Sequence, residues 1–569
     1  MFSLMTPRSF ALLLVPLAIS LSGTAYAQHD GHREATIDMN HGRAERAQER
    51  LETLLEDPVA LWRGQGGAYA RVGKTLEEKG VGYFRELVIP ETHYTLSMLH
   101  SMQGDAAKAL EHAQAAVAKG LQVERFVAGP REAFAALYAA EGYREWLAAQ
   151  HPQGLLHGPM LGHVTEDAAS FWVRTAEESA VTIQVTPEYS CGGISASGTT
   201  RSEDDYTAVI RIDGLQPDSE YSYRVMVDGA LADRPKDFFR TAPERGQASS
   251  FRVVFTACAG YAPEHERIWH TIKDQEPMAL LMLGDNVYID DPEHEITQQF
   301  CYYRRYSRPE WRDLVASTGV YAIWDDHDFG LDDSFGGPEI DEPAWKREVF
   351  NVFRQNWNNP AYGGGDEQPG VWFDFYIGDV HFIMLDGRYY REANGRFPRN
   401  HPPQSENPVM LGPVQLAWLK ETLLESRATF RVIASPVPWA DGVAPRGRQK
   451  YDKWEGFPAE RQAIFDHLAE NEINGVLLIS GDRHRADVHR IDRENGYSLY
   501  DFMSAMATNY HTHPLVEGSG FLFGYNEKNN FGVLEFDTNR ADPTITMEIR
   551  NIDDESVWTH ELRLSELSH

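Results

Sequence analysis

The amino-acid sequence predicts three structural regions in order: an α-helical region, a small all-β module and a larger α/β layered domain. Apolar residues recur at helical spacing as far as about residue 150, and they then alternate in short runs as far as about residue 248. Beyond that point, runs of consecutive apolar residues alternate with helical segments. A chain of 569 residues is too long for one core, so two or three domains are expected.

The composition excludes some classes of partner. The chain has 53 Lys and Arg against 85 Asp and Glu, a net charge of −32. This balance argues against nonspecific binding to nucleic acid or anionic membrane, and it favours cations, including metals. Its 3 cysteines allow at most one intramolecular disulfide. We expect Cys191 and Cys301 to be structural, which leaves Cys258 for chemistry.

Residues 1–27 have the pattern of a secretory signal peptide. Arg8 precedes an apolar run from Phe10 to Leu21, and Ala25-Tyr26-Ala27 offers small residues for cleavage. The run is too short for a comfortable membrane span, and no later stretch reaches about 18 consecutive apolar residues. We therefore expect a periplasmic or secreted protein without a membrane span. Arg8 has no arginine neighbour, which favours the route for unfolded chains over twin-arginine export.

Residues 28–150 are predicted to be mostly helical. The polar, histidine-containing stretch His29–Arg43 is expected to be a flexible start, and helical hairpins are expected from Ala44 to Gln150. Gly104–Leu110 resembles part of a tetratricopeptide-type helix pair, as a single loose match. The region is expected either to pack on the rest of the chain or to bind a protein partner. Two apolar stripes mark its helices: Ala109, Ala113, Ala116 and Val117, and Phe134, Leu137, Tyr138 and Tyr143.

Residues 151–248 are predicted to form a small antiparallel β-sandwich. The phrase Gly214–Tyr223 resembles the turn and tyrosine strand of fibronectin type III-like modules, and we expect no catalytic role for it. Four short alternating runs predict strands: Ser170–Arg174, Val181–Val185, Tyr206–Ile212 and Tyr221–Val227.

Residues 249–569 are predicted to form an α/β layered domain with helices near Val414–Leu424 and Ala459–Glu470. Ligands of such sheets bind beyond the carboxyl ends of the strands. Buried strands are predicted at Val253–Thr256, Ala279–Leu283, Tyr321–Trp324, His381–Leu385, Arg431–Ala434 and Val476–Ile479. Polar residues stand at the ends of these strands: Cys258, Asp285, Asp325 with Asp326, Asp386, and Asp482 with His484.

The stretch Ala279–Asp291 carries the clearest chemical signal. Its apolar run ends at Gly284, and Asp285 follows directly. Tyr288 comes three positions later, so a turn would bring a carboxylate and a phenol to the same metal ion. Asp290 and Asp291, in contrast, match no role in this pattern, and we expect both to be solvated.

Further segments make the pattern specific: Phe255–Cys258, Gly284–Tyr288, Trp324–Asp328, Leu385–Arg391, Leu411–Leu419 and Ser480–His484. In this order, they resemble the alkaline phosphatase D (PhoD-like) family of the calcineurin-type metallophosphoesterase superfamily. The resemblance runs from about Gly158 to the C-terminus. It implies an α+β four-layer (α/β/β/α) metallophosphoesterase sandwich, preceded by an all-β fibronectin type III-like module and an N-terminal α-helical region.

The resemblance also implies a ligand set. A ferric ion would be bound by Cys258, Asp285, Tyr288 and His484, and Asp285 would bridge to calcium held partly by Asp326 and Asp482. Thiolate and phenolate suit a small trivalent ion, whereas carboxylates suit calcium. A pair of calcium ions is expected, and other divalent metals stay open. The alternative for Cys258 is a small buried strand residue.

Other polar residues near these motifs have alternative roles. His327 is expected to face the phosphate, and Arg388 is the candidate phosphate ligand, with a surface salt bridge as the alternative. Asp325 would either orient His327 or bind metal. Asp386 would support the metal cage or anchor its loop. A further calcium site or a shaped turn would explain Asp328, Asp332 and Asp333.

The predicted reaction is hydrolysis of small phosphate esters, with monoesters and diesters both included. Bound metals would lower the pKa of a water molecule, whose hydroxide would attack phosphorus in line with the leaving alcohol. His327 would stabilise or protonate that leaving group. One alternative is a phosphodiesterase, phospholipase D-like in its substrates, that acts on lipid or cell-envelope diesters. Another is a catalytically inactive cell-envelope binding protein.

Overall fold

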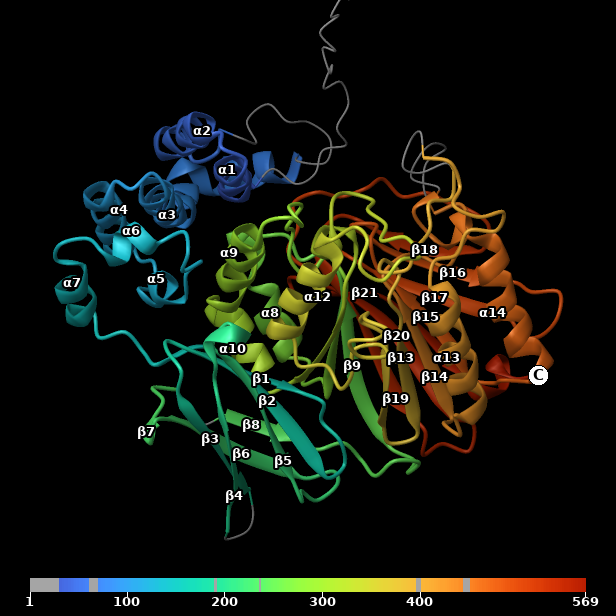
Figure 1. The fold of residues 1–569 in the computed structure, drawn as a ribbon. Helices are drawn as coiled ribbons and strands as arrows, with labels where there is room; N and C mark the ends of the chain where they lie inside the picture. Colours follow the sequence, from blue (N-terminus) through green and yellow to red (C-terminus); the bar gives the residue numbers. More distant parts are fainter. Residues whose placement is uncertain (1–29, 61–69, 189–191, 235–236, 396–400, 444–450) are drawn as a thin grey trace, which may run out of the picture.

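The computed structural model describes residues 30–60, 70–188, 192–234, 237–395, 401–443 and 451–569. The predicted signal peptide, residues 1–27, and Cys191 lie outside the described residues. The described part forms a helical region, a β-sandwich and a large domain with two sheets, which lie side by side in Figure 1. None of its helices combines the length and apolar character needed to cross a membrane.

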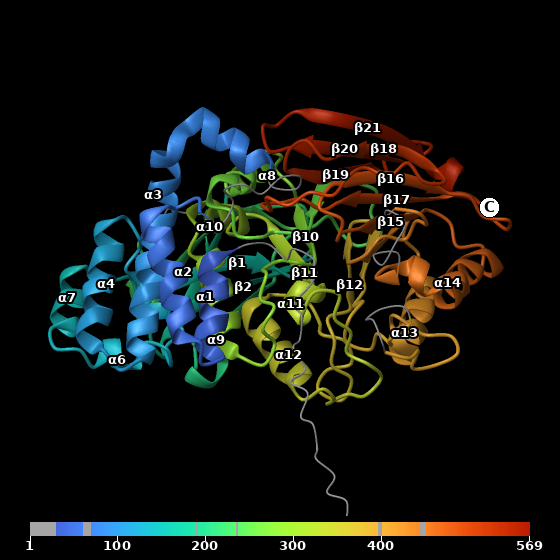
Figure 2. The same ribbon diagram turned by 90° about the horizontal axis from the view of Figure 1, so that it is seen from above.

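The helical region packs beside the large domain, with α1 next to α9 in Figure 2. The buried alanine stripe of α4 packs on α3, as its spacing predicts. Gly80 has a non-helical backbone inside α3 and divides that element. The helices are α1 (Gly31–Asn40), α2 (Ala44–Glu56), α3 (Ala70–Met102), α4 (Ala106–Ala118), α5 (Glu124–Ala128), α6 (Ala135–Tyr138) and α7 (Tyr143–Ala149).

The expectation of a flexible start at His29–Arg43 is wrong from Asp30 onward, because α1 is a regular and largely buried helix. The Asp30 carboxylate accepts hydrogen bonds from the backbone N–H groups of His32 and Arg33 and so caps the helix. Asp30 also pairs with Arg304 of α9. Buried ion pairs and a cap therefore hold a helix that has little apolar periodicity.

Two packed sheets form the β-sandwich below the helical region in Figure 1. Phe171 of one sheet and Tyr223 and Phe239 of the other share its core. The backbone N–H of Gln216 donates to the hydroxyl of buried Tyr221 and fixes the turn before that strand. The strands are β1 (Leu155–Gly162), β2 (Ala168–Thr175), β3 (Ala180–Pro187), β4 (Ile194–Thr199), β5 (Thr207–Asp213), β6 (Glu220–Val227), β7 (Ala230–Leu231) and β8 (Asp237–Arg240).

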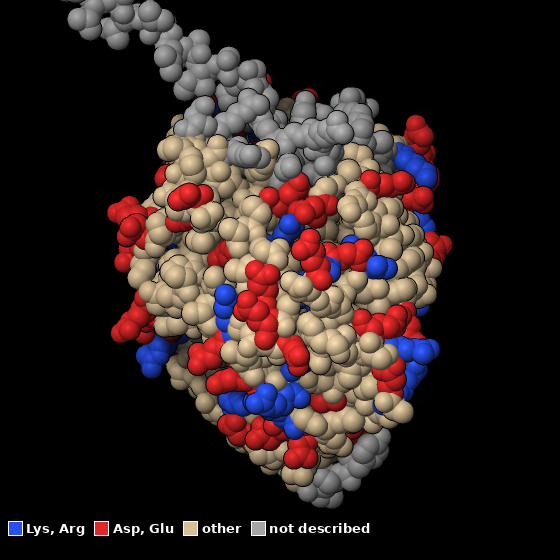
Figure 3. All heavy atoms as spheres, turned by 90° about the vertical axis from the view of Figure 1, so that its right-hand side faces the viewer, with Lys and Arg blue, Asp and Glu red and all other residues tan. Residues whose placement is uncertain are grey.

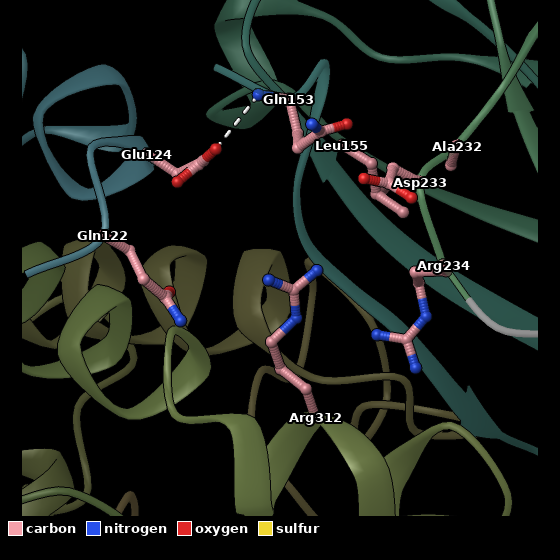
Figure 4. A pocket seen from close by; sticks show the side chains of 8 residues that line it. All are labelled: Gln122, Glu124, Gln153, Leu155, Ala232, Asp233, Arg234 and Arg312. Carbon is pink, nitrogen blue, oxygen red and sulfur yellow. Dashed lines mark hydrogen bonds between the residues drawn. The ribbon is translucent and has the colours of Figure 1, made fainter. Parts of the chain in front are cut away.

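A cavity of about 200 Å³ lies where all three regions meet (Figure 4). Arg234 of the β-sandwich and Arg312 of α10 project into it, and Glu124 of α5 accepts a hydrogen bond from the backbone of Gln153 at its rim. Burial, together with the charge of Arg234, lowers the pKa of Arg312 to about 10. The helical region is therefore fitted against both other regions.

Two mixed sheets form the large domain. The first has the order β11-β10-β9-β19-β20-β21 and the second the order β12-β13-β14-β15-β17-β16-β18. Phe255 of the first sheet packs against Phe502 of the second, and Phe382 packs against Phe536. The first sheet contains β9 (Ser250–Thr256), β10 (Ala279–Leu283), β11 (Gly319–Ile323), β19 (Asn530–Asp537), β20 (Thr544–Asn551) and β21 (Ser556–Arg563). The second contains β12 (Phe373–Ile377), β13 (Val380–Met384), β14 (Phe430–Ser435), β15 (Val476–Ser480), β16 (Ala486–Ile491), β17 (Leu499–Ser504) and β18 (Phe521–Tyr525).

Helices flank the two sheets on opposite sides in Figure 1, with α8 to α10 near β9 and with α13 and α14 beside β14 and β15. Strands β9, β10 and β11 are parallel, as are β13, β14, β15 and β17. Their carboxyl ends deliver the polar residues of the site described next. The helices are α8 (Ile268–Lys273), α9 (Glu295–Tyr306), α10 (Pro309–Val315), α11 (Asp326–Phe329), α12 (Trp345–Asn356), α13 (Gly412–Glu425) and α14 (Pro458–Glu470).

Candidate metal centre

Loops after β9, β10 and β15 bring a thiol, a carboxylate, a phenol and an imidazole together. Cys258 Sγ lies 3.6 Å from Asp285 Oδ2, and the Tyr288 hydroxyl lies 2.9 Å from the same oxygen. His484 Nε2 lies 3.2 Å from the Tyr288 hydroxyl. All four residues are buried. Because one potential metal ligand from each residue points to a common centre, this group can hold an ion.

The backbone at this group is held in an unusual conformation. Cys258, Asp285, Asp482 and His484 have φ of 56°, 50°, 74° and 50°, in the left-handed region that such residues rarely adopt. A Cβ atom added at Gly284 would lie 2.5 Å from the Cβ of Asp325, so only glycine fits there. The strained turns aim the side chains beyond the strand ends, and their convergence indicates a functional centre.

A second, purely carboxylate group adjoins the first. Asp326, Asp333 and Asp452 place one oxygen each within 4.8 Å of one another, and Asp285 forms a similar group with Asp326 and His327. Asp285 thus belongs to both sides of the centre. Asp452, which the sequence did not single out, comes from the segment after β14. Oxygen ligands of this kind are those that Ca²⁺ prefers.

His327 pairs with Asp290, a residue that was expected to be solvated. Its Nδ1 atom lies 2.5 Å from Asp290 Oδ1, and Asp290 Oδ2 accepts from Arg33 of α1 at 2.7 Å. The expectation that Asp290 and Asp291 are solvated is therefore wrong: Asp291 is buried and accepts a hydrogen bond from Thr297. Both carboxylates are enclosed because α1 covers their loop.

Arg388 lies in the centre but is occupied by carboxylates. It is fully buried, its Nε donates to Asp325 Oδ1 at 2.5 Å, and its two terminal nitrogens each lie 3.0 Å from an oxygen of Asp452. Ser334 O accepts a further hydrogen bond from it. The sequence predicts a phosphate ligand here, or else a surface salt bridge. The structure instead gives Arg388 a buried network that fixes two acidic side chains.

The remaining acidic candidates shape the loops. Asp325 accepts a hydrogen bond from Arg388, whereas the His327 ring nitrogens lie 2.5 Å from Asp290 and 3.9 Å from Asp332, so the expectation that Asp325 orients His327 is wrong. Asp328 accepts from the backbone N–H groups of Asn286 and Val287 and forms a capping box with Asp325. Asp386 accepts from Trp324, Val371, Arg388 and Tyr389, and so anchors the loop after β13.

The electrostatics of the centre fit bound cations. Burial raises the pKa of Asp285, Cys258 and Tyr288 well above the ordinary values, and negative neighbours raise it further, while the charge of His327 opposes the rise at Asp285. Asp325 Oδ2 and Asp482 Oδ2 are buried without a hydrogen-bond partner among the described residues, although Asp482 Oδ2 lies 3.5 Å from a terminal nitrogen of Arg483. A bound metal ion would stabilise the ionised forms that burial disfavours here.

The pKa values of the two histidines are shifted in opposite directions. Burial opposes a charge on His327, but Asp290, Asp326 and Asp285 outweigh it and raise the pKa of His327 well above its ordinary value. Burial, together with His511 and His513, lowers the pKa of His484 well below its ordinary value. The surroundings therefore favour the neutral imidazole of His484, the form that binds metals, and the protonated form of His327.

A pocket of about 410 Å³ is lined by Asp290 and Asp332, which both pair with the His327 ring, and by Asp333 of the carboxylate group. Leu331, Phe335 and Trp345 give it an apolar wall. Leu331 is 57% exposed, which is unusual for a leucine at the mouth of a polar centre. The pocket offers space for an organic group next to the predicted metal ligands.

Asn509 also belongs to the centre and was missed by the sequence analysis. Its Nδ2 atom lies 3.1 Å from the Tyr288 hydroxyl and 3.2 Å from His484 Nδ1. It sits between β17 and β18, after no apolar run that would have marked it. The sequence signal that could have pointed to this segment is the pair of histidines His511 and His513. In the structure, ring nitrogens of both lie within 4.8 Å of a ring nitrogen of His484.

Two curated proteins similar to this chain are phosphatases. The chain is 25% identical to alkaline phosphatase D of Bacillus subtilis over 48% of this chain and 52% of that protein, and 21% identical to purple acid phosphatase 23 of Arabidopsis thaliana over 51% and 58%. It therefore spans little more than half the length of either relative. Residues 152–244 match a domain family of unknown function, DUF7800.

Two solved structures have a similar fold. The structure of PhoD has a TM-score of 0.59 at 17% identity and covers 72% of this chain and 90% of that chain. A purple acid phosphatase from yellow lupin (Lupinus luteus) seeds has a TM-score of 0.54 at 12% identity, with coverages of 72% and 75%. The shared mixed sheets are those of a metallophosphoesterase-like fold. Residues 253–527 match the sequence model of the PhoD-like phosphatases, so this segment of the large domain belongs to that family.

Proposed function

We propose that the chain hydrolyses phosphate esters at the centre formed by the ends of β9, β10, β11 and β15. One observation carries the proposal: a thiol, a phenol, an imidazole and several carboxylates, all buried, converge on one point in strained turns. Several buried carboxylates without full hydrogen bonding destabilise a fold, so a purely structural role does not explain their grouping. The matched family and the relatives described above support a phosphatase.

The centre's donor types support unlike ions. We infer that Cys258, Asp285, Tyr288 and His484 would hold Fe³⁺, because anionic sulfur and oxygen donors suit a trivalent ion. Asp326, Asp333 and Asp452, which place one oxygen each within 4.8 Å of one another, would hold Ca²⁺, with Asp285 between the two sides and Asp482 as the further ligand that the resemblance implies. When bound, such ions supply Lewis acidity toward phosphoryl oxygens and lower the pKa of water. Other divalent metals remain alternatives for the carboxylate side.

The chain's own residues would then position the substrate and move a proton. His327 is held by Asp290, which raises its pKa and also lines the pocket that would receive the ester's organic group. In its protonated form, His327 would donate a proton to the departing oxygen. Arg388 would keep Asp325 and Asp452 in register and would not contact the phosphate itself.

Small esters are the proposed substrates, monoesters first and diesters second. The net charge of −32 disfavours polyanions, and the face shown in Figure 3 has basic side chains set among acidic ones. A diesterase acting on lipid or cell-envelope esters is the second candidate, and the apolar wall of Leu331, Phe335 and Trp345 favours it. An inactive binding protein is disfavoured because every predicted ligand position is filled.

Several wider inferences accompany this function. The two packed sheets with helices on opposite sides support the four-layer α/β/β/α sandwich, and the tyrosine-fixed turn at Tyr221 supports a fibronectin type III-like module. We infer export from the N-terminal sequence pattern, and a periplasmic or secreted location with it. The helical region contacts the large domain, so any protein partner would bind its outer face.

The test compares hydrolysis of a nitrophenyl phosphate monoester with that of the bis-nitrophenyl diester by the full chain, before and after chelation and metal restoration. We expect monoester turnover that disappears with metal removal and returns on adding iron and calcium. Turnover of the diester alone would favour the second candidate. A protein that contains both metals yet hydrolyses neither compound would contradict an enzymatic function.

A further inference from the structure

A second cluster of metal-binding side chains lies outside the centre described above. His41 follows the last residue of α1, Asp291 lies in the loop after β10, and His294 precedes α9. One ligand atom from each lies within 4.8 Å of the other two. Two imidazoles and a carboxylate from two separate segments, the end of α1 and the loop between β10 and α9, therefore meet at one point.

The distances match those around a tetrahedral ion. His294 Nδ1 lies 2.8 Å and His41 Nε2 lies 3.2 Å from the same oxygen, Asp291 Oδ1. Bonds of about 2.0–2.1 Å at tetrahedral angles separate neighbouring ligand atoms by about 3.3 Å. The observed separations need only small shifts to admit an ion between them.

The carboxylate is oriented for this role by its other oxygen. Asp291 is buried, and its Oδ2 accepts from Thr297 Oγ1 at 2.6 Å and from Asn40 Nδ2 at 3.3 Å. Asn40 also donates to Thr297 Oγ1 at 2.8 Å, which closes a small network behind the carboxylate. Oδ1 is thereby directed toward the two imidazoles. Such supporting hydrogen bonds are typical of metal ligands.

The cluster is accessible from solvent on one side. His41 has a side-chain exposure of 39%, and both His41 and Asp291 line the 410 Å³ pocket. Three protein ligands with an open side correspond to a site that keeps its fourth position for water. We propose that His41, Asp291 and His294 bind a Zn²⁺ ion, or a divalent ion of similar borderline character, and that this ion fastens α1 to the loop that carries Asp290.

This site differs from the predicted iron and calcium centre in its ligands and in its origin. His41 belongs to the helical region, outside the segment matched by the phosphatase family. Asp291, however, directly follows Asp290, the residue that holds His327. Occupancy would therefore fix the entry side of the pocket without supplying a ligand to the main centre.

The experiment counts metal equivalents in protein that has been stripped by chelation and then equilibrated with Zn²⁺ or Co²⁺. The variant His41→Gln/His294→Asn keeps an N–H donor at each hydrogen-bonding position but removes both imidazoles. We expect the wild type to bind one equivalent more than this variant, and its Co²⁺ form to show an additional visible band. Metal taken up by the main centre is common to both proteins and cancels.

Two further variants keep the test decisive. His41→Gln alone changes a partly exposed side chain and serves if the double variant does not fold, as judged by circular dichroism. His270→Gln removes an exposed histidine that pairs with a single carboxylate, Asp313, and should lose no metal. Equal metal content in the wild type and the His41 variants would overturn the proposal and would leave the phosphatase assignment unaffected.

Discussion

His327 Nδ1 lies 2.5 Å from Asp290 Oδ1, and this contact links the metal centre to the first helix of the chain. Asp290 is also paired with Arg33 of α1 at 2.7 Å. The contact holds the ring of His327, and the charge of Asp290 raises its pKa, which favours the protonated imidazole. A helix that precedes the family-matched segment therefore takes part in positioning the proposed acid.

The variant Asp290→Asn should lower kcat about 10–100-fold while metal content stays at the wild-type level, because the amide can still hold the ring but cannot stabilise its positive charge. The measurement is kcat for the monoester across pH, with metals counted in the same samples. We expect the limb of the pH profile that reports the acid to move to lower pH.

Arg33→Gln offers a control for the same relationship. It removes the charge behind Asp290 but leaves the contact with His327, so its effect on kcat should be smaller than that of Asp290→Asn. Loss of metal in either variant, or an unchanged kcat in Asp290→Asn, would show that the contact is only structural.

The sequence could predict much of this centre because its pattern is local. Each apolar run ended close to the observed strand end, and β10 has the predicted bounds Ala279–Leu283. Cys258, Asp285 and Asp482 follow such runs directly. The predicted helix Val414–Leu424 likewise lies within α13. Buried strands are easily predicted from their apolar runs, and the positions of the polar residues that follow them can therefore be predicted as well.

The supporting residues could not be predicted in the same way. The Arg33–Asp290 and Arg388–Asp452 pairs join segments 257 and 64 residues apart, and no periodicity marks either partner. The sequence of α1 also made its burial hard to predict. A charged helix that is buried through ion pairs has the same composition as a solvent-exposed segment. Arg388 was expected to bind phosphate because arginine side chains often do so. In the folded chain, its guanidinium group instead pairs with the carboxylates of Asp325 and Asp452.

Tyr288→Phe tests the identity of the ion nearest β10. Phenolate bound to Fe³⁺ absorbs visible light, so the iron-loaded wild type should be coloured and the variant should lose this band and part of its iron. Tyr321→Phe, whose hydroxyl contacts the backbone of Val164, is a matched control that should keep the colour. A colourless wild type containing zinc, with unchanged activity in Tyr288→Phe, would rule out the iron assignment.

Arg388→Lys separates two roles for that residue. A lysine ammonium cannot hold Asp325 and Asp452 together as a planar fork does, so calcium occupancy and kcat should fall, the latter about 10–100-fold. KM for the monoester should change little when calcium is saturating, and added calcium should restore part of the rate. A raised KM with full metal content would instead indicate direct contact with phosphate.

Glu460 provides a test of electrostatics away from the metals. It is buried at the start of α14, and its Oε2 accepts from the backbone N–H groups of Met410 and Leu411 at 2.6 and 3.1 Å. Burial raises the pKa of this carboxyl to about 7 from an ordinary 4.5. The folded state therefore binds the proton more tightly than the unfolded state does, and the stability associated with Glu460 falls as pH rises from about 4.5 to about 7.

Glu460→Gln removes this titration and keeps an oxygen acceptor for the two N–H groups. The wild type should lose free energy of unfolding relative to the variant as pH rises through this interval, by at most about 3.5 kcal/mol at roughly 1.4 kcal/mol per pKa unit. Urea denaturation of both proteins at several pH values between 4.5 and 8 measures the difference. The variant Glu470→Gln, at an exposed position of the same helix, controls for the removal of one carboxylate from α14. The free energy of unfolding of the wild type could instead stay constant or rise with pH relative to that of Glu460→Gln. Such a result would contradict the prediction, because it would mean that Glu460 is ionised in the folded protein throughout this interval and that the start of α13 stabilises its charge.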